Sequence, residues 1–305
     1  MGGSGGHNYG YIPKTPRQID ELVEQAEADT QDRASSTDIE RIIDDKLSEI
    51  NDHDYEAIDR HRTQIENKLS ETYEGVESVQ YGGSHSRHTD VSGLSDIDIL
   101  APMGQVADTP ASSKQAIERL ADVLRERYPN SKIETGHMAV TVHFSDGIEI
   151  QVLPAFKVGS DRFKIPDPNS TGWVETCPTA FAKKLTDANR QYNNLVVPII
   201  KVAKYLCDAH NVPVSSYHLE NMIVESLSHY SGRLNQHEML QHVINQAKSQ
   251  VLHRVPDPCG QSNDAAGALS PTERITLASR FRSLEQKIVH ANAVGSSDEW
   301  ETLLN

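Results

Sequence analysis

The sequence predicts an α+β fold in which a small mixed sheet packs against a helical lobe, with a cleft between the two parts. Segments with strand character are confined to residues 76–156, where β-branched residues and period-two alternation are interrupted by glycine turns. Before residue 75 and after residue 181, apolar residues recur at helical spacing instead. Helices followed by a sheet region and then by more helices are typical of α+β proteins, because an alternating α/β fold would interleave the two kinds of element.

The predicted elements divide the chain into three parts. Helices are predicted over 15–31, 35–50, 54–73, 113–129, 193–210, 215–230, 235–251 and 270–294, strands over 76–84, 95–103 and 138–156, and a polar loop over 255–269. The last strand segment is a hairpin, because Asp146-Gly147 is a favoured turn dipeptide. We therefore predict a flexible N-terminus at 1–15, a core with the N-terminal helices at 16–175, and a helical lobe at 176–305.

The composition argues against several classes of protein. The chain has 305 residues and a formal net charge of −15, which disfavours a broad nucleic-acid-binding face, because such faces are usually basic. No apolar stretch is long enough for a membrane span, and the start lacks the apolar core of a signal peptide. The three cysteines, Cys177, Cys207 and Cys259, lack metal-ligand spacing and fit a reducing cytosol. We expect a cytoplasmic protein that binds neither a membrane nor long nucleic acid.

Two carboxylates, Asp96 and Asp98, occupy alternate positions of a predicted strand, shortly after the turn Gly82-Gly83-Ser84. Side chains two apart on a strand project from the same face, so both acids can bind the same ions. A hard divalent cation, Mg²⁺ above all, relieves their mutual repulsion and prefers oxygen ligands. The glycines let backbone amides approach phosphate oxygens closely. The pattern predicts that the turn holds a triphosphate and that the carboxylates hold two Mg²⁺ ions, or Mn²⁺ in their place.

The combination resembles the signature of the polymerase-β-type nucleotidyltransferase superfamily. With Arg87, Thr89 and "SDIDIL", it resembles the bacterial relatives of cyclic GMP–AMP synthase, the cyclic-oligonucleotide synthases of anti-phage signalling. The similarity continues in "FKIPDPNSTGWVETCPTAFAKKL", "VSSYHLE" and "VPDPCGQSND", and it covers residues 55–292. It implies a nucleotidyltransferase core with a helical spine, packed against a C-terminal helical lobe.

The resemblance also implies roles for individual residues. It makes Asp96 and Asp98 metal ligands. The residues that it assigns to nucleotide binding are Gly83, Ser84, Arg87, Lys201, Lys204, Ser216 and Tyr217. Among these, Ser84 and the Gly83 backbone are expected at the donor triphosphate, and Lys204, or Lys201 one turn earlier, at phosphates. Lysine suits that role as a compact point charge. Ser216 is expected to add a hydroxyl, and Tyr217 to stack on a base, which does not fix the identity of the base.

The sequence departs from the family pattern at the third acid. A carboxylate usually lies three residues before the proline of "LPAF", where this chain has Gln151. Glu149, two residues earlier on the same strand face, is our candidate for a third catalytic carboxylate and metal ligand. The alternative is a weakened or inactive site, because an amide binds Mg²⁺ poorly. The sequence leaves the roles of two further residues open. His143 is either a structural histidine or a ligand, and Trp173 is either an anchor of the core or a platform on which a base stacks.

These observations predict a monomeric enzyme that joins nucleoside triphosphates, ATP among them, into a cyclic di- or oligonucleotide and releases pyrophosphate. A regulatory protein partner is compatible with this function. Two alternatives are a nucleotidyltransferase that acts on RNA or on a protein, and a degenerate nucleotide-binding sensor. The acidic charge counts against the RNA version, because an RNA-binding surface should be basic. The choice of base, the linkage and the ring size are not encoded in any motif that we can read.

Overall fold

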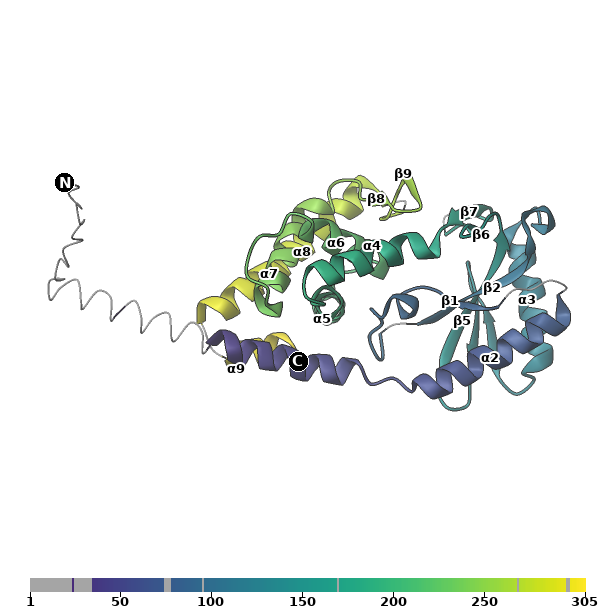
Figure 1. Cartoon of the computed structure of the whole chain (residues 1–305), viewed down its shortest axis with the longest axis horizontal. Coiled ribbons are helices and arrows are strands. Elements are labelled where there is room, and N and C mark those ends of the chain that lie inside the picture. Colours follow the sequence, from purple (N-terminus) through teal and green to yellow (C-terminus); the bar gives the residue numbers. More distant parts are fainter. Residues whose placement is uncertain are drawn as a thin grey trace, which may run out of the picture.

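Figure 1 shows the computed structural model of the chain, in which a group of helices lies beside a sheet that carries its own helices. The structure describes residues 24, 35–73, 78–94, 96–168, 170–267, 269–294 and 297–305. Apart from residue 24, the predicted flexible start and the helix predicted over 15–31 lie outside these ranges. Within them, a mixed sheet and a helical lobe confirm the predicted α+β class.

The central sheet has seven strands, in the order β1-β2-β5-β4-β3, with β6 and β7 extending from β5. The strands are β1 (Gln80–Tyr81), β2 (Ile97–Gln105), β3 (Lys132–Thr135), β4 (Val140–His143), β5 (Glu149–Lys157), β6 (Phe163–Pro166) and β7 (Trp173–Thr176). Only β2 and β5 run parallel; the other pairs are antiparallel. The predicted Asp146-Gly147 turn joins β4 to β5, with Gly147 at a φ of 88° and its N–H donating to the Phe144 carbonyl at 3.1 Å.

The two faces of this sheet differ in chemistry. Helices α2 (Tyr55–Thr72) and α3 (Ser113–Arg127) cover one face, where apolar side chains of β2, β4 and β5 form a buried core with them. At the functional end of the sheet, the strand residues of this core are Ile97, Ile99, Val140, Val142, Ile150 and Val152; Ala101, Met103 and Phe156 join it farther along β2 and β5. Because side chains alternate along a strand, the residues between these point to the opposite face. Those residues, Asp98, Thr141 and Gln151, are polar, and Asp96, which directly precedes β2, continues the same alternation.

Trp173 lies at the edge of the apolar core. Its ring packs edge-on against Phe156 at 5.2 Å, and its Nε1 donates to the Pro110 carbonyl at 2.9 Å. Since both the ring and the polar tip have partners within the fold, the core-anchor interpretation of Trp173 fits this environment better than a base platform does.

A second core belongs to the helical lobe. Its helices are α4 (Pro178–Gln191), α5 (Val196–Ala209), α6 (Ser216–Leu227), α7 (Gln236–Gln250), α8 (Pro271–Val294) and α9 (Ser297–Leu303). The helix at 35–50 packs here too, through Ile39, Ile42, Ile43, Leu47 and Ile50. The predicted division placed this helix with the sheet, but its apolar face is buried against the helical lobe. The chain crosses to the sheet only after it, at residues 51–54 (Figure 1).

The cysteines contradict one expectation. Cys177, just before α4, forms a disulfide with Cys259 in the turn between β8 (Pro256–Asp257) and β9 (Gly260–Asp264), whereas Cys207 is free and buried. The prediction of unpaired, reduced cysteines is therefore wrong for this pair, since their spacing of 82 residues carries no signal in the sequence. Among the described residues, no helix combines the length and apolar character that a bilayer crossing requires.

Candidate active site

The Gly82-Gly83 turn is packed directly on Asp98. The Gly82 N–H donates to the Asp98 backbone carbonyl at 2.8 Å, which joins the turn to the start of β2. Gly83 has a φ of 53°, and a Cβ built on it would lie 1.9 Å from Asp98 Oδ2. Glycine is required here both for the left-handed backbone and for the space that the carboxylate occupies. The turn and the carboxylate, predicted separately from the sequence, therefore form one unit.

The surroundings of Asp96 and Asp98 make it unfavourable for both carboxylates to be ionised. Burial raises the pKa of Asp98 to about 6, and the neighbouring Asp96 contributes to the rise, while Arg87 and Lys204 act in the opposite direction. Burial and Glu149 likewise raise the pKa of Asp96. Two acids that resist ionisation on one strand face, with one packed against Gly83, form an oxygen donor set that suits a divalent cation.

The opposing strand β5 shows which residues stand beside the pair. Asp98 is in register with Gln151, and by extension of the Ile97–Ile150 pair, Asp96 stands beside Glu149. Gln151 Nε2 donates to Asp96 Oδ2 at 2.6 Å. The side chain of Glu149 reaches His143 on β4 instead, where Glu149 Oε1 lies 2.8 Å from His143 Nδ1.

No group of three or more His, Cys, Asp or Glu side chains in the described part of the chain is placed to hold a metal ion. The aspartate pair therefore supplies two carboxylates, and a further ligand has to come from another side chain or from a phosphate.

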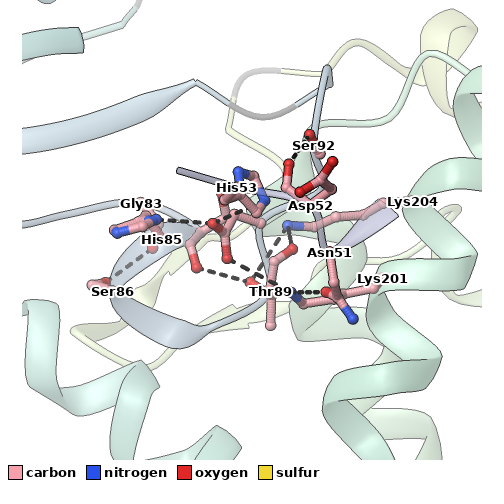
Figure 2. A network of polar contacts seen from close by, with 12 residues as sticks. Asn51, Asp52, His53, Gly83, His85, Ser86, Thr89, Ser92, Lys201 and Lys204 are labelled. Carbon is pink, nitrogen blue, oxygen red and sulfur yellow. Dashed lines mark hydrogen bonds and ion pairs between the residues drawn. The ribbon is translucent and has the colours of Figure 1, made fainter. Parts of the chain in front are cut away.

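A buried ionic cluster lies beneath the turn and ties it to the helical lobe. Its centre is Glu220 on α6, which is fully buried. Arg87 Nε donates to Glu220 at 2.7 Å, Lys204 Nζ lies 2.6 Å from it, and the Thr89 hydroxyl donates to it at 2.7 Å. Burial acts to raise the pKa of Glu220, yet Arg87 and Lys204 hold it below its usual value. Lys204 also donates to the Thr89 carbonyl at 2.8 Å (Figure 2).

The other predicted lysine lies in a neighbouring part of the same network. Lys201 Nζ donates to Asn51 Oδ1 at 2.6 Å (Figure 2). It also lies 3.8 Å from Asp90, which in turn contacts His85 Nδ1 at 2.8 Å. Both lysines are thus buried among protein partners. Their contacts with phosphates stay a prediction, and so do those of Arg87.

Ser84 and the two residues predicted on α6 are placed at the ends of helices. Ser84 directly precedes a single 3-10 turn, His85–Arg87, and is buried. Ser216 is the first residue of α6 and is exposed, while the adjacent Ser215 caps the helix by accepting from the His218 N–H at 3.3 Å. Hydroxyls at a helix N-terminus suit an anionic ligand, because backbone N–H groups point toward it.

Tyr217 is half-buried and faces the β8–β9 hairpin. Its hydroxyl donates to Asp257 at 3.2 Å, and its ring meets Phe181 edge-on at 5.3 Å. Burial raises the pKa of Tyr217, and Asp257 adds to the effect. The phenol is therefore neutral, and its orientation is set at both ends of the side chain, which is compatible with the predicted role in stacking on a base.

Sequence reasoning did not assign a role to Glu220 or to Asp90. Glu220 stands in the quoted motif "VSSYHLE", but nothing in a single sequence connects it with Arg87, which lies 133 residues earlier. A buried acid in the middle of an apolar helix run is the one local signal for such a partner, because a carboxylate is rarely buried unless it is paired.

The fold and the site together define a nucleotidyltransferase: a mixed sheet carries an Asp-x-Asp pair beside a glycine turn, next to a helical spine. A family model agrees. The model of the Second Messenger Oligonucleotide or Dinucleotide Synthetase domain matches residues 36–189, about half of the chain, and the chain belongs to this family.

Individual relatives are distant in sequence. "Probable cyclic nucleotide synthase IK1_05630" of Bacillus cereus (strain VD146) is 25% identical over 203 residues, which span 59% of this chain and 60% of the relative. CdnC of E. coli MS115-1, solved with ATP, superposes with a TM-score of 0.72 at 18% identity and covers 88% of this chain and 95% of its own. The same E. coli protein has also been solved in a CdnC:HORMA-deltaN complex. CdnG of Bradyrhizobium diazoefficiens, solved with GTP, superposes with a TM-score of 0.65 at 16% identity, and the match covers 86% of this chain and 96% of CdnG. These structures share the fold.

Proposed function

We propose that this protein is a metal-dependent nucleotidyltransferase that joins nucleoside triphosphates into a cyclic di- or oligonucleotide second messenger and releases pyrophosphate. The observation that carries the proposal is the packing of the Gly82-Gly83 turn on Asp98, with Asp96 on the same strand face. This arrangement supports the proposal, because a turn suited to phosphate and a carboxylate suited to a metal ion are in direct contact. Membership of a family of second-messenger synthetases supports the same activity.

The residues that would hold Mg²⁺ or Mn²⁺ are Asp96 and Asp98, with Glu149 as the third carboxylate. When bound, two such ions lower the pKa of the attacking ribose hydroxyl and neutralise the departing pyrophosphate. The chain itself binds and orients the substrate. Gly83 and Ser84 receive the triphosphate of the donor nucleotide, and Ser216 adds a hydroxyl at the start of α6. Catalysis then rests on positioning and on charges that are fixed before the substrate arrives.

The cationic groups near the site divide into two kinds in this proposal. Arg87 and Lys204 neutralise the buried Glu220 and lie close enough to Asp98 to favour its ionised form. Lys201 is held next to residues 51–54 and serves the phosphates only after releasing Asn51. Tyr217 offers its ring to a base.

The substrates that we propose are nucleoside triphosphates, ATP among them, as the ATP and GTP bound to the structural relatives suggest. We also propose a monomer that works in the cytoplasm, where these substrates are made, in anti-phage signalling. A regulatory protein partner fits the CdnC:HORMA-deltaN complex of the E. coli relative. Membranes and long nucleic acids are not among the proposed ligands, because the chain carries a net charge of −15.

The test is a synthesis assay. Purified protein is incubated with four α-labelled nucleoside triphosphates and Mg²⁺ or Mn²⁺, treated with phosphatase, and the surviving products are resolved. The proposal expects a phosphatase-resistant product that disappears in Asp96→Ala and Asp98→Ala. Omission of one nucleotide at a time then identifies the bases. A product that persists in both variants contradicts the proposal.

A degenerate nucleotide-binding sensor is the second candidate, because Gln151 places an amide beside Asp98. That function predicts nucleotide binding without turnover under every metal and nucleotide condition. The same assay separates the two candidates when it is combined with a binding measurement on labelled ATP.

A further inference from the structure

The polar face of the sheet continues beyond the aspartates across three more strands. Glu149 on β5 is in register with His143 on β4, and His143 is in register with Lys132 on β3. One step along, Gln151 is paired with Thr141, and Thr141 with Glu134. Cross-strand partners in register project from the same face. The aspartate pair is therefore the end of a band of polar side chains that runs across the sheet.

Within this band, direct contacts link β3 to β5. Lys132 Nζ lies 2.7 Å from Glu134 Oε1, and Glu134 Oε2 lies 2.7 Å from His143 Nε2. The other ring nitrogen, Nδ1, lies 2.8 Å from Glu149 Oε1. Both nitrogens of His143 are thus occupied by carboxylates, so the orientation of its ring is set from two sides. By extension of the Ile97–Ile150 pair, Glu149 is also the neighbour of Asp96 across β2 and β5.

Glu149 needs such a partner if it is to act at the site. Its side chain is 54% exposed, whereas that of His143 is 23% exposed. A free glutamate in solvent samples several rotamers, and fixing one of them costs about 1–2 kcal/mol in entropy. A ligand carboxylate is commonly held by a hydrogen bond from a neighbouring side chain, which orients it toward the metal.

Gln151 makes this arrangement necessary in this chain. It occupies the place beside Asp98, but its amide nitrogen donates to Asp96. An amide that donates to one metal-binding carboxylate cannot replace a third carboxylate, because it brings no negative charge. The nearest acid on the same face of β5 is Glu149, one register step away.

We propose that His143, fixed by Glu134, is a positioning residue that holds the Glu149 carboxylate beside Asp96 and so compensates for Gln151. This inference rests on the proposed function, because it concerns the third carboxylate of that metal site. His143 touches no substrate in this role; it acts through Glu149. The sequence left His143 as either a structural residue or a ligand, and the proposed role, orienting the Glu149 carboxylate, differs from both.

The test measures Mn²⁺ alone by electron paramagnetic resonance, without nucleotide, and then turnover with ATP. His143→Ala is expected to weaken Mn²⁺ binding about tenfold, the lower end of the effect of removing a group that orients a ligand. It is also expected to lower kcat while KM for ATP stays unchanged. His143→Gln, whose amide can still donate to Glu149, should recover most of the affinity.

Two comparisons make the result specific. His61→Ala is the matched control, because His61 Nε2 makes a similar contact with Asp146 at 2.7 Å at the β4–β5 turn; it should leave Mn²⁺ binding unchanged. In a Gln151→Asp background, the third carboxylate stands beside Asp98, so His143→Ala should alter affinity less than about twofold. Thermal unfolding of each variant checks that it is folded.

The possible failures are distinguishable. If Asp98→Ala abolishes Mn²⁺ binding but His143→Ala does not weaken it, the metal site stands and the role of His143 is overturned. The role is also overturned if His61→Ala has an equal effect, or if the His143→Ala loss is the same in the Gln151→Asp background. If Asp98→Ala retains full Mn²⁺ affinity and turnover, the proposed function itself fails.

Discussion

Replacement of Gly83 by alanine tests whether the turn and the proposed metal-binding carboxylate of Asp98 act as one unit. Gly83 has a φ of 53°, so any other residue there is strained by about 1 kcal/mol or slightly more. The new Cβ would lie 1.9 Å from Asp98 Oδ2, whereas ordinary van der Waals contact begins at 3.4 Å. The carboxylate therefore has to move by about 1.5 Å. Displacement of a catalytic group by about 1 Å lowers a rate by roughly 100-fold.

Gly93 provides the matched control, because it lies in the same loop with a φ of 77° and has open space within 4 Å of the position that a Cβ would take. Gly83→Ala and Gly93→Ala should each lower the melting temperature by about 2–4 °C, the effect of roughly 1 kcal/mol on a chain of this size. Only Gly83→Ala should also lose Mn²⁺ affinity and about 100-fold in product formation.

Thermal unfolding, Mn²⁺ binding and the labelled-nucleotide assay on both variants give the answer. Wild-type turnover in Gly83→Ala would refute the reasoning, and so would an equal loss of turnover in Gly93→Ala. In the first case Asp98 does not need the position that it has in the structure. In the second case backbone strain in the loop, and not contact with the carboxylate, is what matters.

Four further predictions concern charge and cross-linking. Asp98→Asn should abolish turnover, but without metal it should raise the free energy of unfolding at neutral pH by about 1–2 kcal/mol. The reason is that the pKa of Asp98 is about 6 in the folded protein, above its unfolded value, so the ionised carboxylate opposes folding above that pH. The gain should vanish below about pH 4, and chemical denaturation at a series of pH values measures it. In the wild type, Mn²⁺ affinity should fall about tenfold from pH 7 to pH 5, since protons compete for Asp98 below its pKa, and a flat profile would contradict this. Glu220→Gln should destabilise the protein by about 3–5 kcal/mol in urea unfolding, because Arg87 and Lys204 lose their buried counter-charge, whereas a change under about 1 kcal/mol would show that the cluster matters little. Cys177→Ser should lower the free energy of unfolding by up to about 4 kcal/mol, because it removes a disulfide that closes a loop of 82 residues. A reductant should lower the melting temperature of the wild type but not that of this variant.

Short-range patterns predict the functional face and four of the seven strands of the sheet (β1, β2, β4 and β5), whereas β3 and, outside the expected 76–156 region, β6 and β7 are not predicted. Alternation over two residues places Asp96 and Asp98 on one face, and the Asp146-Gly147 turn predicts the hairpin, because both features depend on neighbours within a few residues. The Gly82-Gly83 turn is predicted as a phosphate-binding element. Its second purpose, making room for Asp98, depends on a contact across the strand, and no local pattern shows it.

Long-range pairings account for most of what the sequence does not predict. An amphipathic helix at 35–50 is evident from its apolar spacing, but that spacing does not say which core it joins, and it joins the helical lobe. The Arg87–Glu220 ion pair and the Cys177–Cys259 disulfide link residues 133 and 82 positions apart. The strand period predicts the face on which Glu149 lies, but the contact of Glu149 with His143 depends on the register of two strands.

The path of the chain between the two cores limits how they can move. In the described residues two segments lead from one core into the other, at 51–54 and between β7 and α4 at Cys177, and the loop between β1 and β2 also reaches the helical core through Val91. The contacts of Arg87 and Thr89 with Glu220 join the two parts at a third place, in addition to these two connections. Ser92 fastens the first connection to the loop that follows the glycine turn (Figure 2). Its N–H donates to the Ile50 carbonyl at 2.9 Å, and its hydroxyl donates to the Asp52 carbonyl at 2.7 Å. The disulfide fastens the second to the β8–β9 hairpin, against which Tyr217 rests. The loop that follows the glycine turn and the β8–β9 hairpin are therefore each fastened to a segment that joins the two cores, so the relative position of the two proposed nucleotide-binding elements depends on how the cores are held together.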